Sequence, residues 1–131
     1  MVKKICVFGS GSFGTAMATL VARNDPLADV VILTRREDVQ RGINVAHKNP
    51  THCSEFTLSR NIRATTNSED ALKNASVIVH AIPLQSTEQF LDDVIDQISR
   101  LGEIVFVSTS KGIETETLEL PCHLLERVLY R

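Results

Sequence analysis

The stretch VFGSGSFGTA, from Val7 to Ala16, decides how this chain folds. It contains the pattern G-x-G-x-x-G, and its glycines are residues 9, 11 and 14. The apolar residues 5–8 before the pattern predict a short buried strand, and the alanine- and leucine-rich residues 14–23 predict a helix. A strand that leads through such glycines into a helix is the context in which the pattern binds a dinucleotide.

Each glycine of this loop has a separate part in that interpretation. Gly9 permits the tight turn, Gly11 lets the backbone approach a pyrophosphate, and Gly14 lets the helix pack closely on the strand. The pyrophosphate would then rest on the free N–H groups at the start of the helix. The alternative is a glycine-rich connection between strand and helix that binds nothing. We predict the binding loop, which also includes Ser10.

Apolar runs and helical patterns alternate along the rest of the chain. Strands that are almost wholly apolar and are separated by helices indicate a parallel sheet covered on both faces. We therefore predict an α/β fold, a doubly wound and mostly parallel sheet of the Rossmann type in a single domain. The predicted strands are residues 5–8, 30–33, 62–65, 77–82 and 104–107, of which 5–8, 30–33 and 104–107 are predicted to be buried and 62–65 is a weak signal. The predicted helices are residues 14–23, 37–47, 67–74 and 86–101, with a last helix around 124–129.

Two helix starts and one irregular segment can also be predicted. Asn67 precedes acidic residues, which indicates a capped helix start, and the residues from Ser86 to Gln89 fit a capping box. Residues 48–61 form the most polar and least periodic stretch of the chain. We predict that this stretch is an irregular surface segment.

Length and composition restrict the possible classes of protein. The 131 residues suit one domain, and 43% hydrophobic with 23% charged residues is a globular balance. The net charge of −2 offers no basic excess for a nucleic acid or a membrane surface. No apolar run approaches the ~18 residues of a membrane span. Three scattered cysteines, Cys6, Cys53 and Cys122, indicate reduced thiols inside a cell and no metal site.

A second contact with a dinucleotide is expected about 20 residues after the glycine loop. An acidic residue there would hold the ribose hydroxyls, but this chain has Thr34-Arg35-Arg36. Arg35 and Arg36 are suited to a bidentate grip on a 2′-phosphate or to stacking on adenine. The alternative is a pair of solvated charges that neutralise Glu37 and Asp38. The pattern favours a cofactor preference other than strict NAD specificity, and both NAD and NADP stay open as cofactors.

Four segments together give the chain a resemblance to a known family. The glycine loop is shared by many enzymes, whereas the Ser-Lys-Gly-Ile-Glu segment at 110–114 is more particular. With these segments in this order and at this spacing, the chain resembles the NAD(P)-dependent glycerol-3-phosphate dehydrogenases along its whole length. The segments are residues 7–16 (VFGSGSFGTA), 61–66 (NIRATT), 80–83 (HAIP) and 108–114 (STSKGIE).

The resemblance implies an activity and a role for several residues. Enzymes of this family transfer a hydride reversibly between NAD(P)H and dihydroxyacetone phosphate, which gives sn-glycerol 3-phosphate. By resemblance, Ser12 and Phe13 lie near the pyrophosphate, Arg36 lies beside the adenosine, and Pro83 lies beside the cofactor. Lys111 matches a lysine that contacts the substrate, a phosphate dianion that needs a fixed positive charge nearby.

The chain also departs from the family. Residues His52 to Glu55 stand where the family has an aromatic residue followed by Leu-Pro-Gly. His80, inside an apolar strand, is expected to be a neutral core histidine with one satisfied nitrogen rather than a catalytic base. The family has a second, mainly helical domain with the general-base lysine, and we expect this chain to lack it. Residues 1–131 would then be a dinucleotide-binding domain that is inactive alone.

Other functions and several properties stay open. Another two-domain dehydrogenase, such as a ketopantoate-reductase-like enzyme, would share the loop, although the 110–114 segment argues against it. A stand-alone module that senses NAD(P)(H) and regulates a partner would explain the short chain. The protein is expected inside the cell, in the cytoplasm or in an organelle such as a plastid. The sequence also leaves open a homodimer.

Overall fold

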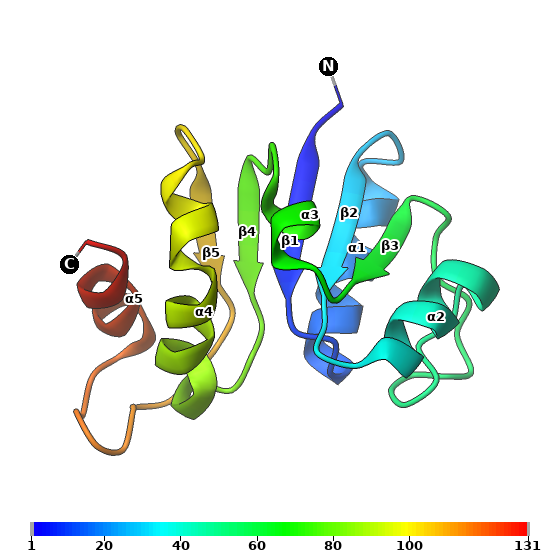
Figure 1. Cartoon of the computed structure of the whole chain (residues 1–131). Helices are drawn as coiled ribbons and strands as arrows, with labels where there is room; N and C mark the ends of the chain where they lie inside the picture. The colour runs from blue at the N-terminus through cyan, green and yellow to red at the C-terminus, as the bar shows by residue number, and fades with distance from the viewer. Residues whose placement is uncertain (1, 131) are drawn as a thin grey trace.

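A parallel sheet carries the fold, and β1 lies at its centre between β2 and β4 (Figure 1). The computed structural model describes residues 2–130. Within that range the sheet has five strands in the order β3-β2-β1-β4-β5, and each neighbouring pair is parallel. In chain order the elements are β1 (Lys4–Phe8), α1 (Ser12–Asn24), β2 (Asp29–Leu33), α2 (Glu37–Ala46), β3 (Ile62–Thr65), α3 (Ser68–Leu72), β4 (Val77–His80), the 3-10 turn η1 (Leu84–Ser86), α4 (Thr87–Ser99), β5 (Val105–Ser108) and α5 (Pro121–Leu129).

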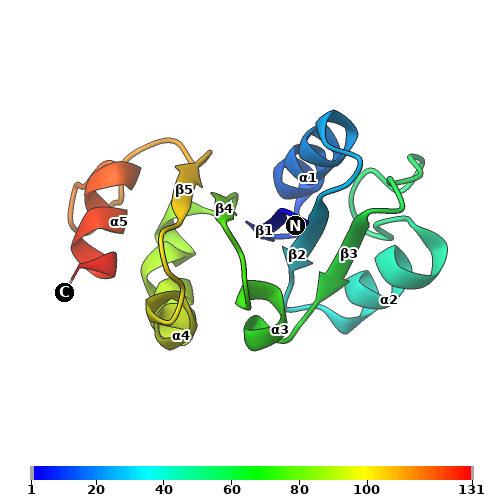
Figure 2. The same ribbon diagram turned by 90° about the horizontal axis from the view of Figure 1, so that it is seen from above.

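Alternating side chains of the strands enter two hydrophobic clusters, one on each face of the sheet. On β1, Ile5 and Val7 pack with residues of α1 and α2, whereas Cys6 and Phe8 pack with residues of α3, α4 and α5. The turned view shows α1 on one side of the sheet and α3 and α4 on the other (Figure 2). The prediction of a doubly wound, parallel α/β sheet is therefore confirmed.

The order of the strands creates a point where the winding of the chain reverses. From β1 the chain proceeds through β2 to β3 on one side, and it then returns to form β4 and β5 on the other side of β1. The connections from β1 and from β4 therefore diverge at the carboxyl ends of these two neighbouring strands. In open α/β sheets this switch point is where ligands bind.

The two predicted helix starts have different outcomes. Asn67 is a true cap, because its side chain accepts a hydrogen bond from the backbone N–H of Asp70 at 2.9 Å. The capping box at Ser86 is wrong, because the turn η1 already gives Ser86 helical backbone angles and its side chain makes no cap hydrogen bond. Instead the Thr87 hydroxyl donates to the carbonyl of Pro83 at 3.1 Å.

The last strand differs from its prediction. Residues 104–107 are predicted as a buried strand, but Val105 and Val107 of β5 are 59% and 40% exposed. Phe106, which points to the opposite face, packs against the cluster formed with α4 and α5. In residues 2–130 no helix covers the face of β5 that carries the two valines, so their apolar character does not lead to burial.

Candidate cofactor-binding site

Two glycines of the loop are required by close packing of the backbone. Gly9 has a φ of +107°, and a Cβ there would lie 2.6 Å from the carbonyl oxygen of Ala81. A Cβ at Gly14 would overlap the carbonyl oxygen of Gly9. The loop, the start of α1 and the chain leaving β4 are therefore in direct backbone contact, which only glycine at these two positions allows.

Gly11 is in a different situation, because it faces open space. It is the N-cap residue of α1 with a φ of −70°, and a Cβ built on it meets nothing within 4 Å. The first N–H groups of a helix have no intrahelical acceptor, and the helix dipole places partial positive charge there. The space in front of Gly11 thus suits an anion, and the residues present fit the pyrophosphate of a dinucleotide.

A buried asparagine fixes the loop in place. Asn49 is fully buried, and its Nδ2 donates to the carbonyl of Ser10 at 2.8 Å and to Oγ1 of Thr15 at 2.9 Å. Its Oδ1 accepts from the backbone N–H groups of Thr51 and His52. The sequence places Asn49 in an irregular polar segment, where Asn-Pro indicates a turn but gives no sign of burial. Sequence reasoning therefore missed this residue.

Residues from three distant segments line a cavity of about 240 Å³ at the carboxyl ends of β1, β2 and β4. The lining shows that the loop, the arginine pair and the Pro83 turn are neighbours in space, although they are distant in sequence. Of the predicted site residues, its lining includes Gly9, Ser10, Arg35, Arg36 and Pro83. The remaining ones, Gly11, Ser12, Phe13, Gly14 and Lys111, lie outside this lining.

The end of β2 is tied to the glycine loop by hydroxyl groups. The Oγ of Ser10 lies 2.8 Å from Oγ1 of Thr34, which also accepts from the backbone N–H of Arg36 at 3.2 Å. These bonds hold the backbone that carries the arginine pair against the loop. The Arg–Arg dipeptide therefore begins at a fixed place on the rim of the cavity.

Both arginines have carboxylate partners. Arg36 makes a two-bond contact with Asp38, at 3.1 and 2.6 Å, and this guanidinium holds the pKa of Asp38 below its usual range. Arg35 lies 3.5 Å from Asp93, and its guanidinium carbon is 5.4 Å from the centre of the Phe90 ring. All four charged side chains are more than half exposed. Such surface pairs stabilise little, so a phosphate can compete for the arginines.

Lys111 lies on an exposed segment after β5 that is bonded to the turn after β4. The hydroxyl of Ser110 donates to the carbonyl of Ile82 at 2.6 Å, and the backbone N–H of Thr109 donates to the carbonyl of His80 at 2.9 Å. Farther along, the Gln85 amide donates to the carbonyl of Ile113 at 3.2 Å. The structure therefore places the Lys111 segment beside the Pro83 turn, at the same edge of the sheet as the glycine loop.

His80 is fully buried, as a core histidine should be. Burial lowers its pKa from 6.5 to about 4, so the imidazole is neutral at physiological pH. The prediction of a neutral core histidine is confirmed, but both ring nitrogens are satisfied rather than one. Nδ1 lies 3.0 Å from Oγ of Ser108, and Nε2 lies 2.8 Å from Oγ1 of Thr87.

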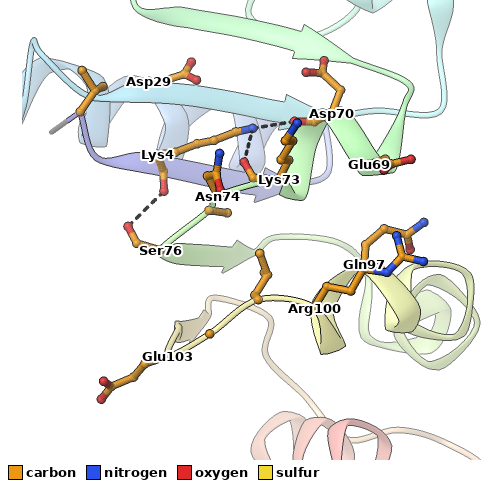
Figure 3. Close-up of a pocket in the computed structure, with 14 residues that line it drawn as sticks. Lys4, Asp29, Glu69, Asp70, Lys73, Asn74, Ser76, Gln97, Arg100 and Glu103 are labelled. Carbon is orange, nitrogen blue, oxygen red and sulfur yellow. Dashed lines mark hydrogen bonds between the residues drawn. The ribbon is translucent and has the colours of Figure 1, made fainter.

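A larger hollow, of about 980 Å³, lies at the opposite end of the sheet, where the strands begin (Figure 3). The Lys4 ammonium reaches across one side of it and donates to the carbonyls of Asp70 and Lys73, at 2.6 and 2.8 Å. This lysine therefore joins the start of β1 to α3 and is occupied by backbone acceptors. The hollow mixes acidic and basic residues and is remote from the glycine loop.

Comparison with known proteins identifies the family. Residues 4–131 match the family described as the NAD-dependent glycerol-3-phosphate dehydrogenase N-terminus. This chain belongs to that family. The resemblance inferred from the four segments is thereby confirmed, and so is the prediction of a nicotinamide dinucleotide as the cofactor class of the family.

Individual relatives agree with this assignment. The chain is 37% identical over 127 residues to a chloroplastic glycerol-3-phosphate dehydrogenase [NAD(+)] of Oryza sativa. The matched region covers 97% of this chain and 28% of the relative. It is 34% identical over 135 residues to a glycerol-3-phosphate dehydrogenase [NAD(P)+] of Bacillus licheniformis, and this match covers 96% of this chain and 38% of the relative. A crystal structure of glycerol-3-phosphate dehydrogenase from Coxiella burnetii, 17% identical, superposes with a TM-score of 0.86 over 99% of this chain and 38% of the other.

The chain thus spans about 28–38% of the length of these relatives. The Coxiella structure, at 17% identity, shows the Rossmann-type fold and nothing finer. Within residues 2–130, no helix is long and apolar enough to cross a membrane.

Proposed function

We propose that this chain is the cofactor-binding part of a dehydrogenase that transfers a hydride between NAD(P)H and dihydroxyacetone phosphate, giving sn-glycerol 3-phosphate. The observation that carries the proposal is the convergence of the glycine loop, the arginine pair and the Pro83 turn at the switch point between β1 and β4. The family match over residues 4–131 supports the choice of reaction.

Different residues would bind the cofactor and the substrate on two sides of the carboxyl edge of the sheet. The loop from Gly9 to Gly14 and the start of α1 would hold the pyrophosphate, and Arg35 and Arg36 would face the adenosine end. On the other side, Lys111 would attract the phosphate or carbonyl oxygen of the substrate. When bound, the nicotinamide supplies the hydride, and the protein supplies position and charge.

The rest of the enzyme is also a matter of proposal. We infer that residues 1–131 are one dinucleotide-binding domain and that a helical substrate domain with the general base completes the site. This chain alone should then not reduce dihydroxyacetone phosphate at a useful rate, because proton transfer and enclosure are missing. We infer an intracellular protein, which forms a homodimer if any oligomer, with neither nucleic acid nor membrane as a partner.

Blocking the space in front of α1 tests the binding loop. Gly11→Val should weaken NADH binding by about tenfold or more, because the new side chain occupies the place of the pyrophosphate. The fold should be kept, since a Cβ at Gly11 meets nothing within 4 Å. Titration of nicotinamide fluorescence measures the effect, and Gly102→Val, also in open space, is the matched control. Equal affinity in all three proteins would remove the binding loop from the proposal.

The arginine pair decides the preference between the two cofactors. Replacing Arg35 and Arg36 with Ala should weaken NADPH at least about tenfold more than NADH, because a charge-assisted bidentate bond to the 2′-phosphate is lost. The same titration with both cofactors measures this ratio. Arg41→Ala, an exposed position on α2, controls for the loss of positive charge. An equal loss for NADH and NADPH would show that the pair does not recognise the 2′-phosphate.

A further inference from the structure

The imidazole of His80 connects the two segments that form the β4–β5 side of the site. Its Nδ1 lies 3.0 Å from the hydroxyl of Ser108, the last residue of β5 and three residues before Lys111. Its Nε2 lies 2.8 Å from the hydroxyl of Thr87, the first residue of α4. The Thr87 hydroxyl also lies 3.1 Å from the carbonyl oxygen of Pro83. A continuous series of polar atoms therefore runs from β5 to the Pro83 turn.

For a neutral imidazole, only one arrangement of protons satisfies all three of these contacts. The carbonyl of Pro83 can only accept, so the single proton of the Thr87 hydroxyl must point to it. Thr87 must then accept from His80, which places the imidazole proton on Nε2. Nδ1 is left as an acceptor, and the Ser108 hydroxyl donates to it. The bonds thus run in one direction, from Ser108 to His80, to Thr87 and to Pro83.

This direction requires a neutral imidazole, because a protonated ring has two donors and no acceptor. His80 and Thr87 are both fully buried. Burial is also the cause that lowers the pKa of His80 to about 4. The ring therefore keeps the neutral form that the bonds need at physiological pH.

The backbone of His80 holds the same segments as its side chain. Its carbonyl accepts from the N–H of Thr109 at 2.9 Å and from the Thr109 hydroxyl at 2.7 Å. Two residues farther along, the carbonyl of Ile82 accepts from Ser110 at 2.6 Å. Thr109 and Ser110 directly precede Lys111, so the position of the lysine relative to the Pro83 turn depends on His80 and its neighbours.

We propose that His80 is a positioning residue of the cofactor site. As a neutral imidazole protonated on Nε2, it fixes the Pro83 turn and the Ser108–Lys111 segment relative to each other. It acts through Thr87 and Ser108 and itself touches neither cofactor nor substrate. The proposal rests on the proposed function, because it assigns His80 to the same dinucleotide site.

The proton arrangement can be read directly by nuclear magnetic resonance. In the 131-residue chain labelled with ¹⁵N-histidine, Nε2 of His80 should show the shift of a protonated nitrogen and Nδ1 that of an unprotonated acceptor. In Thr87→Val the acceptor is gone, so the proton should move to Nδ1 and be donated to Ser108. In Ser108→Ala, Thr87 is still present, so the proton should stay on Nε2. The two variants therefore predict opposite responses, and the exposed Ser108 site keeps the test available if Thr87→Val does not fold.

The positioning role is tested by cofactor affinity on the same proteins. Thr87→Val should weaken NADH binding by about fivefold, the equivalent of one net hydrogen bond, and Thr87→Ser should restore it. Thr19→Val is the matched control, because the hydroxyl of Thr19 donates to the carbonyl of Thr15 within α1. That variant should bind NADH like the parent protein.

Each outcome has one consequence. A parent protein with the proton on Nδ1 would overturn the directed series of bonds. Unchanged NADH affinity in Thr87→Val, with binding in the parent protein intact, would overturn the positioning role and leave the proposed function standing. A parent protein that binds neither NADH nor NADPH would instead overturn the proposed function, and the nitrogen shifts would still report the proton arrangement separately.

Discussion

The strands β1 and β5 are built alike but end in different surroundings. Val7, Val79 and Val107 lie side by side in register on the same face of β1, β4 and β5. Their exposed fractions are 0%, 3% and 40%. The residue type is the same but the surroundings differ, because α1 and α2 form a cluster with Val7 in the central strand, whereas Val107 lies on the edge strand and no described helix covers it. The burial of a strand is therefore decided by the layer that packs on it and not by its own apolar residues.

The same difference extends to the loops that follow the two strands. The glycine loop after β1 is held by backbone contacts that leave no room for a Cβ at Gly9 or Gly14. The Lys111 segment after β5 is held by the backbone bond from Thr109 to His80 and by side-chain hydrogen bonds, and a Cβ at Gly112 meets nothing within 4 Å. We infer that the pyrophosphate side of the site is rigid and that the Lys111 side depends on a few individual bonds.

A pair of glycine substitutions gives the largest expected contrast. Gly14→Ala should lower the free energy of unfolding by about 4 kcal/mol, because the methyl group overlaps the Gly9 carbonyl and the backbone must move. Gly112→Ala should cost only about 1–2 kcal/mol, the strain of its φ of +102°. Urea denaturation of both variants measures the difference. Equal losses would break the contrast between a rigid and an open loop.

The pH dependence of the free energy of unfolding tests whether His80, which joins the Pro83 turn to the Lys111 segment, stays neutral in the folded chain. Between pH 6.5 and about 4, His80 binds a proton in the unfolded chain but stays unprotonated in the folded chain. The free energy of unfolding should therefore fall through this window as the pH is lowered, by on the order of 3 kcal/mol from this group. Below pH 4 both states carry the proton, and this contribution stays constant. Denaturant unfolding from about pH 7 downwards measures it.

The protonation of the His80 imidazole can also be measured directly. The C2 proton of His80 should titrate with a midpoint near pH 4 in the folded chain. A midpoint near 6.5 would mean that the ring is open to water, and the β4–β5 side would then be looser than its hydrogen bonds indicate.

A matched pair of valines gives the smallest expected effects and the most direct comparison. Val7→Ala should cost about 2 kcal/mol, because a fully buried site loses two methyl groups and keeps a cavity. Val107→Ala, already 40% exposed, should cost less than about 1 kcal/mol. Thermal or urea unfolding reports both values. If Val107→Ala proved as costly as Val7→Ala, another layer must cover β5 in solution.

The parts of the molecule that depend on local sequence could be predicted. The glycine loop, the alternation of strands and helices and the Asn67 cap all follow from neighbouring residues, and the structure has each of them. Features that depend on distant contacts could not be predicted. Val105 is exposed because no helix within residues 2–130 covers its face of β5, and the burial of Asn49 depends on the Ser10 carbonyl, 39 residues away.

The roles of the site residues show the same limit. The alternative of solvated charges for the arginine pair included Asp38, which does engage Arg36, but the sequence gives no sign of Asp93 on α4, which engages Arg35. His80 is identifiable as a core histidine from its apolar neighbours. Its second bonded nitrogen could not be foreseen, because Thr87 and Ser108 approach it only in the folded sheet.

The central place of β1 also affects how the chain is made. During synthesis β1 can pair with β2 once residue 33 has emerged, but its other edge waits for residues 77–80. Until then a strand that is apolar from Ile5 to Phe8 has an open edge, which is a site for wrong pairing with other chains. We therefore expect nascent chains that stop before β4 to need a chaperone, and chains that include β4 to fold with less mispairing of β1.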